Sequence, residues 1–225
     1  MRFGKLMGKN VFLSMILCSV ASFSFLHADN LKECESEEDK KAGCVEKQYY
    51  DSGNLKEETL YQNGVKHGME KTYHESGNLK YEIIYKNGKI DGIYKSYYEG
   101  NLFQESTFKS GIRHGITKVY NVISGNLVVE TSYKSDQKDG IQKHYYPSGD
   151  ILAEIPYTNG KVNSIVKFYD KGKKLIWQAN AQNGKIISGK CVSGKVMTNA
   201  HLTRLTNEID EFEIGGDYWY DICKQ

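Results

Sequence analysis

Residues Tyr73–Ser96 run YHESGNLKYEIIYKNGKIDGIYKS, and this stretch contains the clearest structural pattern in the chain. Across Leu79–Tyr85 every second side chain is apolar or aromatic, which is the period of a β-strand. Asn87-Gly88 and Asp91-Gly92 then supply residue types that accept positive φ, as a chain reversal requires. Ile93–Tyr98 follows as the returning strand. The stretch therefore predicts one β-hairpin.

This hairpin is one copy of a repeat of about 24 residues, and three glycine series keep the same period. The first series is Gly53, Gly77, Gly100, Gly125, Gly149 and Gly172. The second is Gly64, Gly88, Gly111, Gly160 and Gly184, with Asp136 in the fourth place. The third is Gly68, Gly92, Gly115, Gly140 and Gly189, with Ser164 in the fifth place. A lone hairpin cannot shelter an apolar face, so the copies are expected to stack.

The repeat and the composition together predict an all-β fold. The chain has 225 residues with 17 Tyr, 22 Gly and only 2 Pro, a balance that favours strands joined by glycine turns. We expect six hairpins over residues 49–190, joined into one elongated antiparallel meander of about a dozen strands. Pro156 falls inside a predicted strand and indicates an edge or a bulge.

Two charged rows follow the repeat. Glu58, Glu82, Glu105, Glu130 and Glu154 share one position, with Gln178 in the sixth copy, and Lys71, Lys95, Lys118, Lys143 and Lys167 share another. A column of carboxylates repels itself, so we expect the Lys row to lie beside the Glu row. The alternative, a carboxylate pair that cleaves glycans, is disfavoured because such a pair is local whereas these residues recur in every copy. The sequence predicts no catalytic, cofactor-binding or metal-binding residue.

Aromatic rows recur as well. One ends the first strand of each copy: Tyr61, Tyr85, Phe108, Tyr133 and Tyr157, with Ala181 in the last. Packing between repeats is the simpler role for this row. The alternative is a binding surface for a peptide, glycan or lipid, since Tyr offers an apolar ring with a polar tip. Trp219, in the segment after the repeats, is a further candidate for that surface.

The N-terminus predicts export. Residues 1–28 join a basic start to an uncharged apolar run, Val11–Leu26, that ends at Ala28, as in a secretory signal peptide. An uncleaved N-terminal anchor is the alternative. Without its three basic residues, the chain has 27 basic and 28 acidic side chains, a net charge of −1. The chain therefore lacks the excess of basic residues that is typical of proteins that bind nucleic acid.

Four cysteines remain in the exported chain, in one pair before the repeats and one pair after them. An even number in an exported protein predicts two disulfides, and the clustering favours Cys34 with Cys44 and Cys191 with Cys223. We expect residues 29–48 to form a loose, acidic disulfide loop.

Residues 191–225 predict a C-terminal cap. Thr198 and Asn199 favour a helix start, and an apolar stripe continues to about Ile214 before Gly215-Gly216. Repeat arrays need such a cap over their last unit.

The pattern Y-x-x-x-G-x-L-x-x-E-x-x-Y-x-x-G-x-x-x-G, clearest over Tyr73–Gly92, resembles the bacterial variant of the MORN repeat. The resemblance extends from about Tyr49 to Gly189. It implies a sheet of stacked hairpins used for protein or lipid contact, and it brings no catalytic residues. Some bacterial proteins with such repeats are labelled antitoxins, so an antitoxin-like partner of a toxin is one alternative function.

From these features we expect a non-enzymatic, exported binding or scaffold module of the cell envelope, periplasmic or secreted. Its expected partner is another envelope protein, or else a lipid or glycan surface. An envelope glycan-acting enzyme, or an accessory of one, is the alternative from another functional class.

Overall fold

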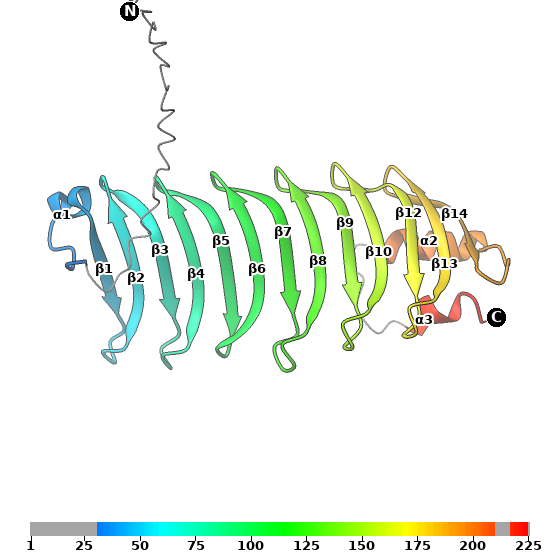
Figure 1. The fold of residues 1–225 in the computed structure, drawn as a ribbon, viewed down its shortest axis with the longest axis horizontal. Coiled ribbons are helices and arrows are strands. Elements are labelled where there is room, and N and C mark those ends of the chain that lie inside the picture. The colour runs from blue at the N-terminus through cyan, green and yellow to red at the C-terminus, as the bar shows by residue number, and fades with distance from the viewer. Residues whose placement is uncertain (1–30, 210–216, 225) are drawn as a thin grey trace, which may run out of the picture.

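The computed structural model describes residues 31–209 and 217–224, and the predicted signal peptide lies outside them. A single 14-stranded sheet forms the body, with its strands in chain order from β1 to β14 (Figure 1). Neighbouring strands are antiparallel, which confirms the predicted all-β meander. Figure 1 shows an elongated array, with α1 at one end and α2 and α3 at the other.

Six hairpins account for most of the sheet. Hairpin 1 is β2 (Leu55–Gln62) and β3 (Val65–Tyr73), hairpin 2 is β4 (Leu79–Lys86) and β5 (Lys89–Tyr98), and hairpin 3 is β6 (Asn101–Lys109) and β7 (Ile112–Tyr120). Hairpin 4 is β8 (Leu127–Lys134) and β9 (Gln137–Tyr145). Hairpin 5 joins β10 (Ile151–Thr158) to a divided return strand, β11 (Lys161–Val162) and β12 (Ser164–Tyr169), and hairpin 6 is β13 (Leu175–Gln182) and β14 (Lys185–Cys191).

Each hairpin reverses through a two-residue turn with positive φ at both positions. In hairpin 2, Asn87 has φ 50° and Gly88 has φ 76°, the combination of a type I′ turn, whose twist matches that of the strands. Asp136 takes the glycine position of hairpin 4 with φ 64°. Its Oδ1 accepts a hydrogen bond of 2.8 Å from the backbone N–H of Arg113, which ties this turn to the preceding hairpin.

The third glycine series lies in a bulge in hairpins 1 to 4, whereas Gly189 of hairpin 6 pairs regularly with Ala179. Ile83 pairs with Tyr94 and Tyr85 pairs with Ile90, so Ile84 alone faces three residues of the return strand. Gly92 has φ 140°, and a Cβ on it would come within 3.1 Å of the Ile84 side chain, so a larger residue here would be strained. Pro156 stands where Ile84 stands, opposite the break between β11 and β12, and its carbonyl accepts from Asn163 N–H at 2.9 Å. The predicted bulge at the proline is therefore present.

The two faces of the sheet differ. We call inner the face that carries Tyr81, Ile83 and Tyr85 of β4, and outer the face that carries Glu82. Over hairpins 5 and 6 the inner face is covered by the C-terminal segment and contains the main hydrophobic core. Its buried members include Ile155, Val166, Phe168, Trp177, Leu205 and Trp219.

The C-terminal cap contains two helices, α2 (Asn199–Glu208) and α3 (Asp217–Asp221). Thr198 caps α2 as expected, because its hydroxyl accepts from the backbone N–H of His201. The predicted helix continued to about Ile214, whereas α2 ends at Glu208. The predicted stop at Gly215-Gly216 lies outside the described residues.

Residues 29–48 were predicted to form a loose loop, and the structure differs from this over the described part. Here lie α1 (Glu37–Ala42) and β1 (Cys44–Tyr49), which is the first strand of the sheet. The Ser36 side chain caps α1, whose first turn holds three acidic residues, a favourable arrangement at a helix N-terminus. The backbone N–H groups of Asn63 and Gly64 donate to carbonyls of α1, so the helix is held against the first hairpin turn.

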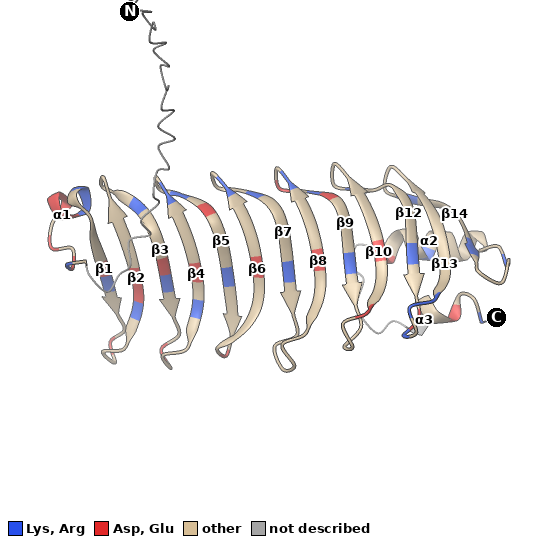
Figure 2. Ribbon diagram, viewed as in Figure 1, with Lys and Arg blue, Asp and Glu red and all other residues tan. Residues whose placement is uncertain are grey.

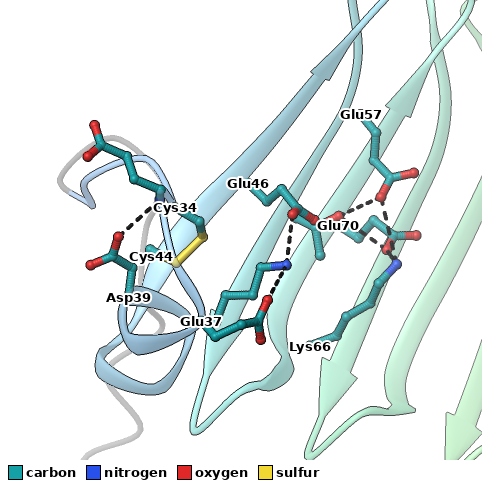
Figure 3. Close-up of polar contacts among 11 residues, drawn as sticks. Cys34, Glu37, Asp39, Cys44, Glu46, Glu57, Lys66 and Glu70 are labelled. Atoms are coloured by element: carbon teal, nitrogen blue, oxygen red, sulfur yellow. Dashed lines mark hydrogen bonds and ion pairs between the residues drawn. A yellow bond between two sulfur atoms is a disulfide. The ribbon is translucent and has the colours of Figure 1, made fainter.

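Both disulfides pair as predicted, Cys34 with Cys44 and Cys191 with Cys223, with Cα–Cα distances of 5.2 and 5.8 Å. The first joins the start of the described chain to β1 (Figure 3). The second joins β14 to the segment after α3. Each cap is thus covalently attached to the sheet.

Candidate functional site

A band of alternating charge crosses the middle of the sheet (Figure 2), and the strand register places its side chains on the outer face with Glu82. Glu82 pairs with Lys71 on one side and with Lys95 on the other, and the same register recurs in the other hairpins. The band runs Lys47, Glu58, Lys71, Glu82, Lys95, Glu105, Lys118, Glu130, Lys143, Glu154 and Lys167. The expected neutralisation of the Glu row by the Lys row is therefore present, with N–O distances of 3.3 Å for Lys71–Glu58 and 3.6 Å for Lys167–Glu154.

Tyrosine hydroxyls add a second contact to this band. Tyr97 donates to Glu82 at 2.6 Å and Tyr169 donates to Glu154 at 2.9 Å. Burial, followed by the hydrogen bond from the hydroxyl to Glu154, raises the pKa of Tyr169 to about 12, so its hydroxyl stays protonated at neutral pH. These contacts join the two strands of one hairpin, and an ion pair of 4.0 Å between Lys95 and Glu105 links hairpin 2 to hairpin 3, so the carboxylates have a repeated structural role.

A row of large apolar side chains also lies on the outer face. Each follows directly after the third glycine of its repeat, or after Ser164 in the fifth repeat. This row was not singled out from the sequence, although the spacing of the glycines contains the signal. Its members are all exposed: Met69, Ile93, Ile116, Ile141 and Ile165.

The predicted aromatic surface lies on the inner face, near the type I′ turns. Most of its rings lie beneath a cation from the neighbouring unit: Lys40 over Tyr61 at 4.7 Å, Lys66 over Tyr85 at 5.2 Å, Arg113 over Tyr133 at 3.8 Å and Lys138 over Tyr157 at 4.5 Å. Phe108 instead meets Tyr94 edge to face, with ring centroids 6.1 Å apart. The row therefore packs repeat against repeat through cation–π contacts.

Two residues of the predicted surface are buried. Tyr157 is 3% exposed and Trp219 is 4% exposed, and both belong to the core beneath the C-terminal cap. They cannot offer an open contact surface in this conformation, because cap and sheet already enclose them. Tyr61, Tyr85, Phe108 and Tyr133 are half-buried.

At the N-terminal end, hairpin 1 is polar and closely paired on its inner face. Lys66 contacts Glu57 at 3.7 Å and forms an ion pair with buried Glu70 (Figure 3). Lys40 of α1 reaches Glu46 of β1 at 2.8 Å and lowers the pKa of its carboxyl through their hydrogen bond. This end of the inner face is therefore occupied by ion pairs.

Between the two caps, the inner face has an open groove over hairpins 2 and 3, with a volume of about 630 Å³. Its lining comes from three consecutive strands and the loops between hairpins: His74, Lys80, Tyr81, Tyr94, Ser96, Tyr97, Tyr98, Phe103, Gln104 and Val122. Tyr98 is 57% exposed and Phe103 is 44% exposed, unusually high values for large apolar rings. The helices lie at the two ends of the array, away from this groove (Figure 1).

The groove combines aromatic rings with positive charge. The rings of Tyr81 and Tyr94 lie 5.9 Å apart, and the Lys80 ammonium is 5.4 Å from the centre of the Tyr81 ring. Neither Asp nor Glu is among the described residues that line it. Such a site suits a ligand that brings an apolar or aromatic group together with negative charge.

None of the groove residues was among the site candidates drawn from the sequence. Tyr81 and Tyr94 differ from their counterparts in the next hairpin, Gln104 and Thr117, and this departure from the repeat was an available signal. Lys80 and Phe103 were harder to place, because each is the extra residue where the register shifts between hairpins. Such a shift alters which face a side chain joins.

Within residues 31–209 and 217–224, no group of three or more His, Cys, Asp or Glu side chains could hold a metal ion. No helix in the same described ranges has the length and apolar character needed to cross a membrane.

The model of the MORN repeat variant family matches residues 45–63, 66–87 and 138–159. These matches fall on β1–β2, β3–β4 and β9–β10, so each covers the junction between two successive units. Among curated proteins, no match to the chain is found.

Among solved structures, the chain has a weak likeness to a crystal structure of an S. aureus TarM mutant in complex with fondaparinux, alpha-GlcNAc-glycerol and UDP. The match has 9% identity and a TM-score of 0.16, and it covers 65% of this chain and 22% of that one. A TM-score this low carries no argument about fold or function. Three segments of the chain are thus similar to the MORN repeat variant, and all three lie within the meander sheet.

Proposed function

We propose that this protein is a non-enzymatic binding module of the cell envelope, and that it holds its partner on the inner face of hairpins 2 and 3. The observation that carries the proposal is the open groove of about 630 Å³ with exposed Tyr98 and Phe103. Over hairpins 5 and 6 the same face is covered by the cap. Exposed aromatic patches on a folded protein mark contact sites.

A non-enzymatic role is supported by the recurrence of the acidic residues. The Glu row repeats along the outer face, where Lys residues and Tyr hydroxyls contact it. A catalytic carboxylate pair needs two members in different environments, one of which holds a proton. The repeated, paired arrangement of the Glu row favours a structural role instead.

The envelope location rests on two features. Residues 1–28 have the layout of a secretory leader, and the four remaining cysteines form two disulfides. Disulfides of this kind persist in oxidising compartments, so they fit a non-cytoplasmic protein.

The proposal is tested by site-specific photo-crosslinking in the native envelope. The photoreactive residue p-benzoylphenylalanine replaces Tyr98, which lines the groove, or Tyr49, a matched control that is 54% exposed on β1. We expect a discrete protein adduct from position 98 in the envelope fraction and none of the same mass from position 49.

Equal adducts from both positions, or none from position 98, would contradict a specific partner on the inner face. An adduct of position 98 with lipid or glycan alone would replace the protein partner by that surface. Recovery of the protein only from the cytosol would contradict the envelope location.

A further inference from the structure

The residues that line the groove in hairpins 2 and 3 hold the same positions in their repeats as residues of hairpins 5 and 6 that lie beneath the C-terminal cap. The spacing of the repeat aligns His74, Lys80 and Tyr81 with Tyr146, Leu152 and Ala153. It also aligns Tyr94, Ser96 and Gln104 with Val166, Phe168 and Trp177. The first set lines the groove, and all six of the second set belong to the core beneath the cap.

The cap shows how this location on the sheet holds a protein segment. Trp219 packs with its ring centroid 5.4 Å from that of Trp177, and Tyr220 meets Phe168 edge to face at 5.0 Å. The indole N–H of Trp177 donates to the backbone carbonyl of Trp219 at 2.9 Å, and the Tyr220 hydroxyl donates to the Tyr146 hydroxyl at 2.6 Å. The segment is thus held by aromatic packing and two hydrogen bonds.

The groove offers the same two kinds of contact from different residues. Tyr81, Tyr94 and Phe103 supply the rings. His74 stands in the position of Tyr146, which accepts a hydrogen bond from the cap, and Gln104 stands in the position of Trp177, which donates one to it. Each therefore brings a polar side chain to a place where the cap is hydrogen-bonded. An aromatic segment can therefore be packed and hydrogen-bonded here.

Charge distinguishes the groove from the site beneath the cap. Lys80 replaces Leu152, and the groove lining within the described residues contains no carboxylate. A carboxylate of the incoming segment would compensate the Lys80 ammonium, as charge-complementary interfaces do. The cap segment Asp217–Asp221 has the sequence DYWYD, in which two Asp residues flank three aromatic residues.

We infer that the groove over hairpins 2 and 3 binds an acidic, aromatic segment of a partner protein, with the chemistry of this chain's own α3. The inference rests on the proposed function and names the partner class for the same face. A protein segment is favoured over an acidic glycan because this sheet already binds such a segment at the aligned positions of hairpins 5 and 6.

Binding is tested on the full exported chain by fluorescence anisotropy, with a fluorescein-labelled peptide of residues 215–222. The disulfide-tethered cap keeps hairpins 5 and 6 occupied during the measurement. We expect saturable binding that Tyr81→Ala weakens by about tenfold or more, as the loss of a central aromatic contact does. Tyr133→Ala, an aromatic change on the same face outside the groove, should leave affinity unchanged.

Charge is tested by a swap. Lys80→Glu should weaken binding of the acidic peptide and improve binding of a peptide in which both Asp residues are Lys. Lys109→Glu, an exposed change at the turn end of β6, is the control and should alter neither affinity. Circular dichroism of each variant verifies that the sheet is intact.

Absence of peptide binding, or binding that Tyr81→Ala and Lys80→Glu leave intact, would overturn the inference. Binding of an oligogalacturonide in place of the peptide would overturn it in favour of an acidic glycan. The crosslinking experiment separates these failures from failure of the proposed function. A protein adduct from position 98 that the peptide cannot displace would support the binding module and would reject this partner class.

Discussion

His144 lies in the interior of the inner face of hairpin 4, at the position that Phe168 occupies in hairpin 5. Burial, and secondarily the nearby Lys138 ammonium, lowers its pKa from 6.5 to about 3. In the unfolded chain the imidazole gains a proton near pH 6.5, whereas in the folded chain it stays neutral. The unfolded state therefore binds more protons between these two values, and stability must fall as pH falls through this window.

We predict that His144→Gln removes part of the acid sensitivity of folding. Between pH 6.5 and pH 5, the histidine contributes a loss of about 2 kcal/mol to the free energy of unfolding. Urea titrations at several pH values measure it, and exposed His114→Gln is the control. If the free energy of unfolding changes with pH equally in wild type and in His144→Gln, this histidine is not held neutral in the folded chain.

At the scale of elements, the Cys191–Cys223 disulfide holds the cap on the inner face of hairpins 5 and 6. The chain has two tryptophans, Trp177 and Trp219, and both are buried where cap and sheet meet. Tryptophan fluorescence therefore reports on this contact alone. The Cys34–Cys44 disulfide at the other end of the array has no tryptophan near it and serves as an internal comparison.

We predict that Cys191→Ala with Cys223→Ala loosens the cap and shifts tryptophan emission to longer wavelength. The disulfide spans 32 residues, a loop whose closure contributes about 3–4 kcal/mol in the chain-entropy model. Thermal unfolding followed by fluorescence should show a lower midpoint for this pair, whereas Cys34→Ala with Cys44→Ala should leave the tryptophan spectrum unchanged. An unshifted spectrum in the first variant would mean that packing alone holds the cap.

In the whole molecule, the two caps lie against different kinds of surface, one polar and one apolar. At the N-terminal end, α1 lies against a hairpin whose inner face carries ion pairs. At the C-terminal end, the cap covers Ile155, Phe168 and Trp177, which belong to the main hydrophobic core. The array without this cap would present a broad apolar face, and such faces drive association.

We predict that a chain ending at Cys191 self-associates. Size-exclusion chromatography with light scattering should give a mass that rises with concentration, in contrast to the full chain. A second truncated variant with Phe168→Ser and Trp177→Gln, the residues that hairpins 2 and 3 have at these positions, should be closer to monomeric. If the first truncation stays monomeric and folded, the cap is dispensable for shielding the array.

Local chemistry accounts for the part of the fold that could be predicted. Asn87-Gly88 forms a tight turn whatever surrounds it, and the turn sets the register that brings Glu82 opposite Lys95. Since each hairpin contacts only its neighbours, repetition of one hairpin produces the meander. Ser36 also had the right residue type for capping α1, yet the helix was missed because the segment has few apolar side chains to reveal a periodic pattern.

Turn chemistry and spacing within about one repeat account for the hairpins, the meander and the charged band, and the clustering of the cysteines before and after the repeats indicated the two disulfides. The burial of Tyr157 and Trp219 and the exposure of Tyr98 and Phe103 follow instead from the three-dimensional arrangement of cap and sheet. Which stretch of an inner face is covered depends on where the cap folds back, and Trp219 meets Trp177 across 42 residues of chain. Spacing within one repeat holds no information about such a contact.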